Sequence, residues 1–134
     1  MVTSALRETP NGNKVIHKIE EMIVQGVTVL SGTDEARLTF LAARRWYGWD
    51  AGRLLVLDIG GGSLEVAMGS DEEPTVALPG ITPERTMQIV GGGVVADEIM
   101  KALNIQEVEI CPWVLREGAI LRWLDQFGRA RLGF

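Results

Sequence analysis

The apolar residues of this chain recur with two periods, which predict alternating helices and strands. Apolar side chains spaced three and four residues apart form one face of a helix, whereas short apolar or β-branched runs are typical of strands. The first pattern predicts helices at about 13–25, 34–47, 82–103 and 113–127. The second predicts strands at 27–30, 53–59, 63–68, 75–78 and 107–111. Such alternation favours an α/β architecture.

The last of these helices carries many large apolar side chains, and we expect it to pack through them. The residues expected to be buried are Trp113, Ile120, Trp123, Leu124 and Phe127.

The composition is that of a globular protein with an excess of acidic residues. Apolar residues make up 46% of the chain and charged residues 23%, which argues against a disordered chain. The net charge of −5 disfavours nucleic-acid binding through a positive surface field. A polyanionic ligand would therefore have to be bound locally, by positive side chains, backbone N–H groups and metal.

Cysteine content and the length of the apolar runs bear on where the chain works. Cys111 is the only cysteine, so no internal disulfide can form and we expect a reducing compartment. We interpret Cys111 as a small buried side chain on a strand. No basic region followed by an apolar stretch opens the chain, and no apolar run approaches ~18 residues. These features predict a cytoplasmic protein without a membrane span.

The most informative segment is an apolar run that ends in an acid and continues into glycines. Asp58 closes the run, and the residues that follow include Gly60, Gly61, Gly62, Ser63 and Glu65. Consecutive glycines leave backbone N–H groups unshielded, so the turn can close around an anion. Carboxylates supply the oxygen ligands that Mg²⁺ prefers. The segment therefore predicts a phosphate-binding loop with a metal site. The alternative is a glycine-rich hairpin between two core strands, with Glu65 merely solvated.

A second glycine cluster, Gly91–Gly93, fits the GxGxxA pattern of dinucleotide-binding sites. That site requires a strand directly before the glycines. Thr82 and Pro83 instead predict a helix start, with a capping hydroxyl and a proline at the first helical position. We interpret the cluster as part of a helix whose glycines let another backbone or a nucleotide approach closely. The GxxxxGK[ST] phosphate loop is missing from the sequence.

Glu35 follows a predicted strand and a Ser–Gly turn, which places it at a helix start near strand ends. Ligands of open α/β sheets collect at such places. The alternative is an ordinary acid in the first helical turn, where it interacts favourably with the helix dipole. Position alone favours this second interpretation.

Two motifs, in this order, resemble the exopolyphosphatase / guanosine pentaphosphate phosphohydrolase (Ppx/GppA) family. They are VLSGTDEARL at 29–38 and LVLDIGGGSLE at 55–65. Upstream, TSALRE at 3–8 followed by Asn11 is similar to the family's segment before the same helix. Downstream, VEICPWVLREG at 108–118 is similar to the carboxyl end of actinobacterial members. The resemblance covers nearly the whole chain in two blocks, about 1–78 and 79–127.

The resemblance implies a partial actin-like ATPase, ribonuclease H-like fold. It also implies Mg²⁺-dependent release of terminal phosphate from inorganic polyphosphate or guanosine pentaphosphate. Glu35 matches the family's proposed catalytic base, and Asp58 and Glu65 match its metal- and water-positioning acids. The matching phosphate-binding residues are Gly60, Gly61, Gly62 and Ser63 in the family's second phosphate loop, and Arg7.

The resemblance also implies that parts of the family domain are missing. Family members begin with a strand and a first phosphate loop, and they continue through a long second subdomain after the strand that matches 75–78. Here Leu78 is followed directly by a segment similar to the family's far end. We therefore expect residues 1–78 to form a partial first subdomain with the second phosphate loop. Residues 79–134 are expected to be a C-terminal part packed into the same domain.

Two functions stay open at this point. The first is a phosphohydrolase of the exopolyphosphatase family. The second is a non-catalytic truncated remnant that acts as a phosphate-binding or interaction domain. A truncated α/β domain exposes strand edges and apolar surface, which favours association. We therefore expect a homo-oligomer that binds neither nucleic acid nor membrane.

Overall fold

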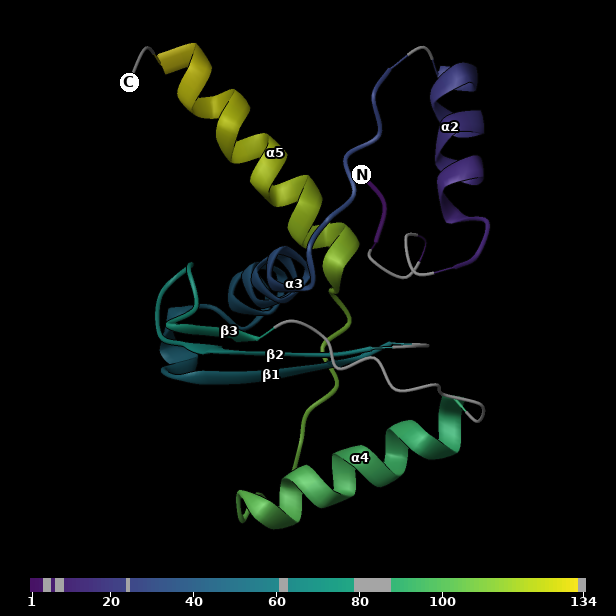
Figure 1. Cartoon of the computed structure of the whole chain (residues 1–134). Coiled ribbons are helices and arrows are strands. Elements are labelled where there is room, and N and C mark those ends of the chain that lie inside the picture. The colour runs from purple at the N-terminus through teal and green to yellow at the C-terminus, as the bar shows by residue number, and fades with distance from the viewer. Residues whose placement is uncertain (4–5, 7–8, 24, 61–62, 79–87, 133–134) are drawn as a thin grey trace.

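The computed structural model describes residues 1–3, 6, 9–23, 25–60, 63–78 and 88–132, and it mixes helices with one small sheet (Figure 1). The elements, in chain order, are α2 (Gly12–Ile23), α3 (Gly32–Tyr47), the 3₁₀ turn η1 (Trp49–Ala51), β1 (Leu54–Ile59), β2 (Leu64–Gly69), β3 (Val76–Leu78), α4 (Gln88–Ala102) and α5 (Leu115–Leu132). Most of these lie where the sequence pattern predicts them.

The sheet is an antiparallel meander in the order β1-β2-β3. The register of β1 against β2 runs from Leu54 opposite Gly69 to Ile59 opposite Leu64, so Asp58 lies directly opposite Glu65. The strand predicted at 75–78 is confirmed by β3, which pairs with β2. The hairpin thus places the two acids of the glycine motif side by side.

One face of the sheet is covered by α3, and the small core lies between them (Figure 1). Phe40 and Ala36 of α3 are fully buried against Ala67 of β2, and Leu54 and Val56 of β1 pack around them. Successive side chains of a strand point to opposite faces, so Asp58 continues the face that begins with Leu54 and Val56. This alternation directs Asp58 toward α3.

Both ends of α3 are fixed by interactions that its sequence supplies. The Ser31 side chain accepts a hydrogen bond from the Asp34 N–H, which is a standard helix N-cap. At the other end the buried Arg44 guanidinium donates to the carbonyl oxygens of Gly48, Gly52 and Gly69. Arg44 thereby ties the end of α3 to the η1 turn and to the end of β2.

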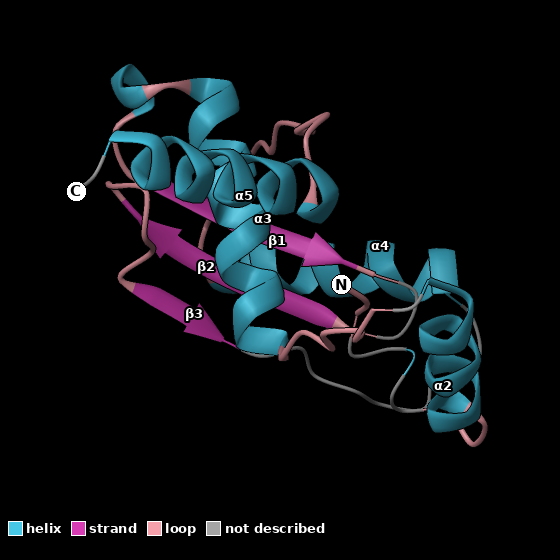
Figure 2. Ribbon diagram, turned by 90° about the horizontal axis from the view of Figure 1, so that it is seen from above, coloured by secondary structure: helices cyan, strands magenta, loops and turns pink. Residues whose placement is uncertain are grey.

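The helix α5 crosses over α3 on the side away from the sheet (Figures 1 and 2). The crossing is close at Gly118, because a Cβ atom there would overlap the Leu38 carbonyl. Arg45 of α3 also pairs with Asp125 of α5 at 3.0 Å. The C-terminal block of the chain is thus held on the N-terminal block through α3.

Three expectations for the C-terminal block are wrong. No strand forms at 107–111; within the described residues no neighbouring strand pairs with this segment, and Ile110 is 90% exposed. Cys111 is accordingly half-buried and lies outside any strand. The apolar side chains of α5 that were expected in the core are partly exposed, because the later part of the helix extends beyond α3 (Figure 1).

The segment 27–30 also differs from expectation, since it forms only a single parallel bridge between Val29 and Val2. The predicted helix start at Thr82 and Pro83 lies outside the described residues. The helix α4 lies on the side of the sheet opposite to α3, and α2 stands apart from the sheet (Figure 1). Among the described residues, no helix combines the length and the apolar character needed to cross a membrane.

Candidate functional site

The two neighbouring acids at the start of α3 have opposite environments. Asp34 is exposed, accepts a hydrogen bond from the Ser31 hydroxyl at 2.6 Å and lies 4.0 Å from Arg37. Glu35 is only 5% exposed. A carboxylate that is buried is normally paired with another group or coordinates a metal. Asp34 therefore accounts for the ordinary capping chemistry of this helix end, and the burial of Glu35 favours the functional interpretation.

Asp58 and Glu65 form a direct cross-strand pair of like charge. The register of β1 and β2 puts them opposite each other, on the face that α3 covers. Like charges at such positions destabilise an antiparallel pair by up to about 1 kcal/mol. Glu65 is 3% exposed, so it is not the solvated acid of the simple hairpin alternative. A pair of carboxylates in this arrangement is suited to holding a cation.

The Glu65 carboxyl is electrostatically coupled to both other acids. Burial raises the pKa of Glu65, and the negative charges of Asp58 and Glu35 raise it further, against the lowering effect of a hydrogen bond from Ser63. Its oxygen Oε1 is buried without a hydrogen-bond partner among the described residues. The structure therefore brings Glu65 close to Asp58 and Glu35, although the three acids come from different elements.

Thr39 belongs to this site but was missed at the level of the sequence. Its hydroxyl donates to Asp58 Oδ2 across 2.9 Å, and its side chain is 4% exposed. Thr39 follows Glu35 by four residues, so the two share one face of α3. The four-residue spacing from Glu35 was the sequence signal that could have identified Thr39 as part of the site. The hydrogen bond holds the Asp58 carboxylate in one orientation and leaves Oδ1 for another ligand.

The glycine turn is described only at its two ends. The Gly60 N–H donates to the Ser63 carbonyl oxygen at 2.9 Å, which closes the hairpin beside Asp58 and Glu65. Gly61, Gly62 and the expected phosphate-binding Arg7 lie outside the described residues. The described ends of the turn, Gly60 and Ser63, thus lie next to the two acids.

The second glycine cluster lies inside a helix, as the sequence interpretation expected. Helix α4 begins at Gln88, so helical residues directly precede Gly91, and the strand that a dinucleotide site requires is missing there. A Cβ atom on Gly92 would lie 3.0 Å from Ile59 Cγ2, whereas Gly91 and Gly93 face open space. Of the three glycines in this cluster, only Gly92 therefore lies close to another element in the described part of the chain.

The acids fit Mg²⁺ by their chemistry. No set of three or more His, Cys, Asp or Glu side chains within the described ranges is arranged to enclose a metal by itself. Mg²⁺ does not require such a cage, because it is usually held by one or two carboxylates, with water and substrate phosphates as the other ligands. Glu65 Oε1, which lacks a partner in the described part of the chain, and the Asp58 carboxylate could provide two such ligands.

Comparison with known proteins identifies related sequences. The chain matches the model of the Ppx/GppA phosphatase family over residues 1–78 and 72–127. It is 31% identical to exopolyphosphatase 1 of Mycobacterium leprae over 226 aligned positions, which cover 92% of this chain and 67% of that protein. The same protein of Mycobacterium tuberculosis is also 31% identical, with 92% of this chain and 66% of the relative covered. An alignment of 226 positions is longer than the 134 residues here, so it includes positions at which this chain has no residue.

A solved structure shares the fold of about three quarters of this chain. An exopolyphosphatase from Cytophaga hutchinsonii superposes with a TM-score of 0.55 at 27% sequence identity. The match covers 76% of this chain but only 38% of that protein. This chain therefore spans well under half of the length of its structural relative.

Proposed function

The chain belongs to the Ppx/GppA phosphatase family, whose actin-like, ribonuclease H-like fold it shares in part, and we propose that it is a phosphohydrolase. Its substrate is inorganic polyphosphate or guanosine pentaphosphate, from which it releases the terminal phosphate. The observation that carries the proposal is the convergence of three acids, Glu35 of α3, Asp58 of β1 and Glu65 of β2, in a largely buried cluster. The relatives named as exopolyphosphatases support polyphosphate as the substrate, whereas guanosine pentaphosphate follows from the family alone.

In this proposal Glu35 is the general base. Its carboxylate accepts a proton from a water molecule whose oxygen forms the new bond to the terminal phosphorus. The bridging P–O bond breaks, and the shortened chain leaves with the bonding electrons. A positioned base contributes about 10²- to 10⁴-fold to the rate of such reactions. The burial of Glu35 supports the role, because a buried carboxylate keeps a fixed position with little competition from bulk water.

Asp58 and Glu65 are proposed to hold Mg²⁺, and the Thr39 hydroxyl orients Asp58 by donating a hydrogen bond to its Oδ2. The cation, when bound, neutralises charge on the phosphate oxygens, which is the main requirement of phosphoryl transfer. The backbone of the turn from Gly60 to Ser63 is proposed to bind a phosphate group, together with Arg7. We also propose a cytoplasmic location, which agrees with the single cysteine.

The test is phosphate release from each of the two substrates by the purified chain, with Mg²⁺ and with excess EDTA. Glu35→Gln keeps the shape of the side chain but cannot accept the proton, so we expect it to lower the rate by about 10²- to 10⁴-fold. Asp34→Asn is the matched control, because it removes a neighbouring but exposed acid of the same helix. Equal rates for wild type and Glu35→Gln would refute the base assignment. A folded chain that binds polyphosphate without any release would instead be a phosphate-binding domain.

A further inference from the structure

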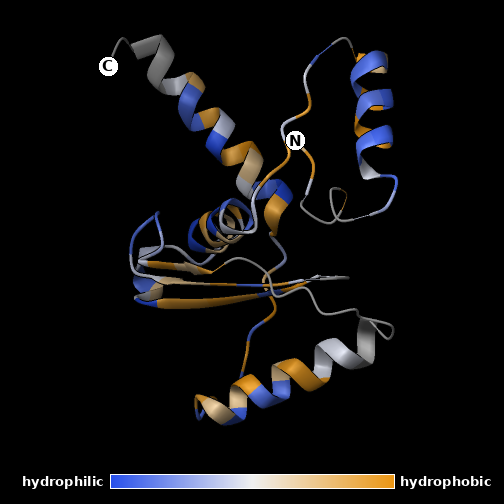
Figure 3. Ribbon diagram, viewed as in Figure 1, coloured by the Kyte–Doolittle hydropathy of each residue, from blue (hydrophilic) through white to orange (hydrophobic). Residues whose placement is uncertain are grey.

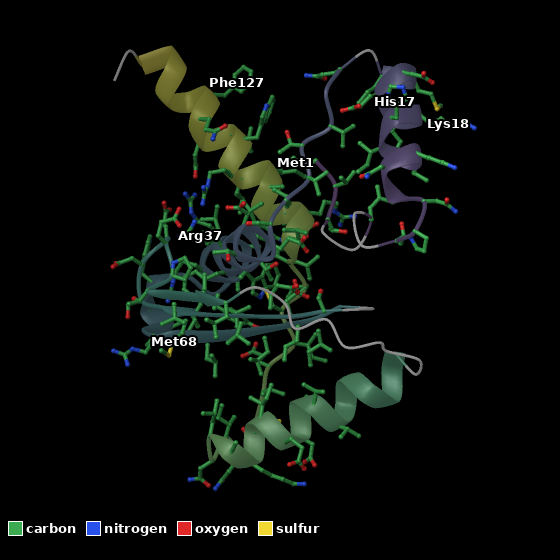
Figure 4. All side chains as sticks on the ribbon, viewed as in Figure 1. Met1, His17, Lys18, Arg37, Met68 and Phe127 are labelled. Atoms are coloured by element: carbon green, nitrogen blue, oxygen red, sulfur yellow. The ribbon has the colours of Figure 1, made fainter. Side chains whose placement is uncertain are left out.

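The end of β1 lies between two helices. Successive side chains of a strand point to opposite faces, so Asp58 and Ile59 point to opposite sides of the sheet. On one side lies α3, whose Thr39 hydroxyl donates to Asp58 Oδ2 at 2.9 Å. On the other side lies α4 (Figure 1), and Figure 4 shows the side chain of Met68, a residue opposite Leu55 in the register, on that side. Ile59 follows Leu55 by four residues in the same strand, so its side chain also points toward α4.

Gly92 lets the backbone of α4 approach Ile59 closely. A Cβ atom on Gly92 would lie 3.0 Å from Ile59 Cγ2. Carbon atoms pack best at about 3.5–4.0 Å, so even a methyl group at this position would push Ile59 aside. Gly92 is buried, whereas a Cβ on Gly91 or Gly93 would have no neighbour within 4 Å. The close approach therefore requires glycine at one of the three positions only.

The helix α4 turns this glycine inward together with apolar side chains, and Figure 3 shows apolar residues along the helix. Val95 and Ile99 follow Gly92 at intervals of three and four, so the three residues share one face of α4. Both side chains are half-buried. The segment that follows α4 is attached to α3, because Trp113 packs on Trp46 with ring centroids 5.5 Å apart. These contacts give α4 a defined place against the sheet.

We propose that Gly92 is a positioning residue of the candidate site, which fixes the start of the phosphate-binding turn through Ile59. The residue after Ile59 is Gly60, whose N–H donates to the Ser63 carbonyl oxygen and closes the turn. A displaced Ile59 side chain would move the backbone of Gly60, because the two are joined directly. Asp58 would stay in place, since the hydroxyl contact from α3 holds it from the other side. The proposal rests on the proposed function in that the turn must bind phosphate for its position to matter.

Amide ¹H–¹⁵N nuclear magnetic resonance of the full chain without ligand tests the contact itself. We expect Gly92→Ala to shift the amide signals of Gly60 and Ser63. Gly93→Ala is the matched control, because it gains the same helix propensity while its Cβ faces open space. Ile59→Ala removes the Cγ2 atom, so in that background Gly92→Ala should leave both signals in place. Unmoved signals in Gly92→Ala, or equal shifts in Gly93→Ala, would overturn the proposal.

Binding and kinetics test the consequence for the site. We expect Gly92→Ala to raise the KM for polyphosphate at least ~5-fold while kcat changes less than ~2-fold, because the base Glu35 lies on α3 and stays in place. Calorimetric titration with inorganic tripolyphosphate and Mg²⁺ should show the same rise in the dissociation constant, and Gly93→Ala should show neither change. A loss in kcat alone, or an equal rise in KM for Gly93→Ala, would overturn the proposal. The amide signals do not depend on hydrolysis, so they decide the contact with Ile59 even if the chain releases no phosphate and the proposed function fails.

Discussion

Replacing Thr39 by valine tests whether a buried hydroxyl fixes the Asp58 carboxylate. Valine keeps the β-branched shape and removes only the oxygen that donates to Asp58 Oδ2 across 2.9 Å. A hydrogen bond to a charged group contributes about 1.5–3 kcal/mol. Because Asp58 is only partly buried, water replaces some of this interaction. We therefore expect the free energy of unfolding to fall by about 1.5 kcal/mol, at the lower end of that range.

The assay is urea unfolding followed by tryptophan fluorescence, arranged as a double-mutant cycle. The cycle compares wild type, Thr39→Val, Asp58→Ala and the double variant. If the two side chains interact as the structure shows, their coupling energy is about 1.5 kcal/mol. Thr39→Ser keeps the hydroxyl and should retain most of the coupling. Additive effects of the two single changes, to within about 0.5 kcal/mol, would refute the reasoning.

Three further predictions concern other parts of the structure. Gly118→Ala should destabilise the chain by several kcal/mol in chemical denaturation, because its Cβ would overlap the Leu38 carbonyl. Gly128→Ala in the same helix faces open space and should stabilise the chain by up to about 1 kcal/mol. A larger loss of stability for Gly128→Ala than for Gly118→Ala would contradict the α3–α5 crossing. Arg44→Met should cost at least ~2 kcal/mol, since it leaves three backbone carbonyls without their donor, and an unchanged urea midpoint would rule this out. Burial raises the pKa of Glu65 above its ordinary value of 4.5, so the folded chain binds more protons at this residue than the unfolded chain does. In metal-free buffer the melting temperature should therefore fall as the pH rises above 4.5. Glu65→Gln should make that fall smaller. Parallel pH profiles for wild type and Glu65→Gln would show that Glu65 is not responsible.

Local sequence signals were sufficient for the elements that position the site. Ser31 and the acids after it predicted the start of α3, and the apolar run that ends at Asp58 predicted β1. Glu35 was placed correctly at a helix start near strand ends. Its burial could not be read from position alone, because it depends on how closely α3 packs against the sheet.

The features that the sequence did not reveal depend on contacts distant in the chain. The Thr39–Asp58 hydrogen bond joins residues 19 apart and exists only once α3 lies on the sheet. The segment 107–111 has strand-forming residues, but a strand needs a partner to pair with, and none lies beside it in the described part of the chain. The burial of Phe127 and its neighbours was expected from their apolar character. It fails because the later part of α5 extends beyond the element on which the helix packs (Figure 1).

The central proposal, with polyphosphate as the substrate that the named relatives support, is that the protein removes phosphate from the ends of the polymer, and ³¹P nuclear magnetic resonance of the reaction tests it most directly. Signals of orthophosphate, chain-end phosphate and internal phosphate are separate in such spectra. We expect orthophosphate to grow at the expense of internal phosphate while the number of chain ends stays constant, and we expect Glu35→Gln to suppress this change. A rising number of chain ends would mean internal cleavage, and an unchanged spectrum with folded wild-type protein would mean no hydrolysis. Either result would contradict the account.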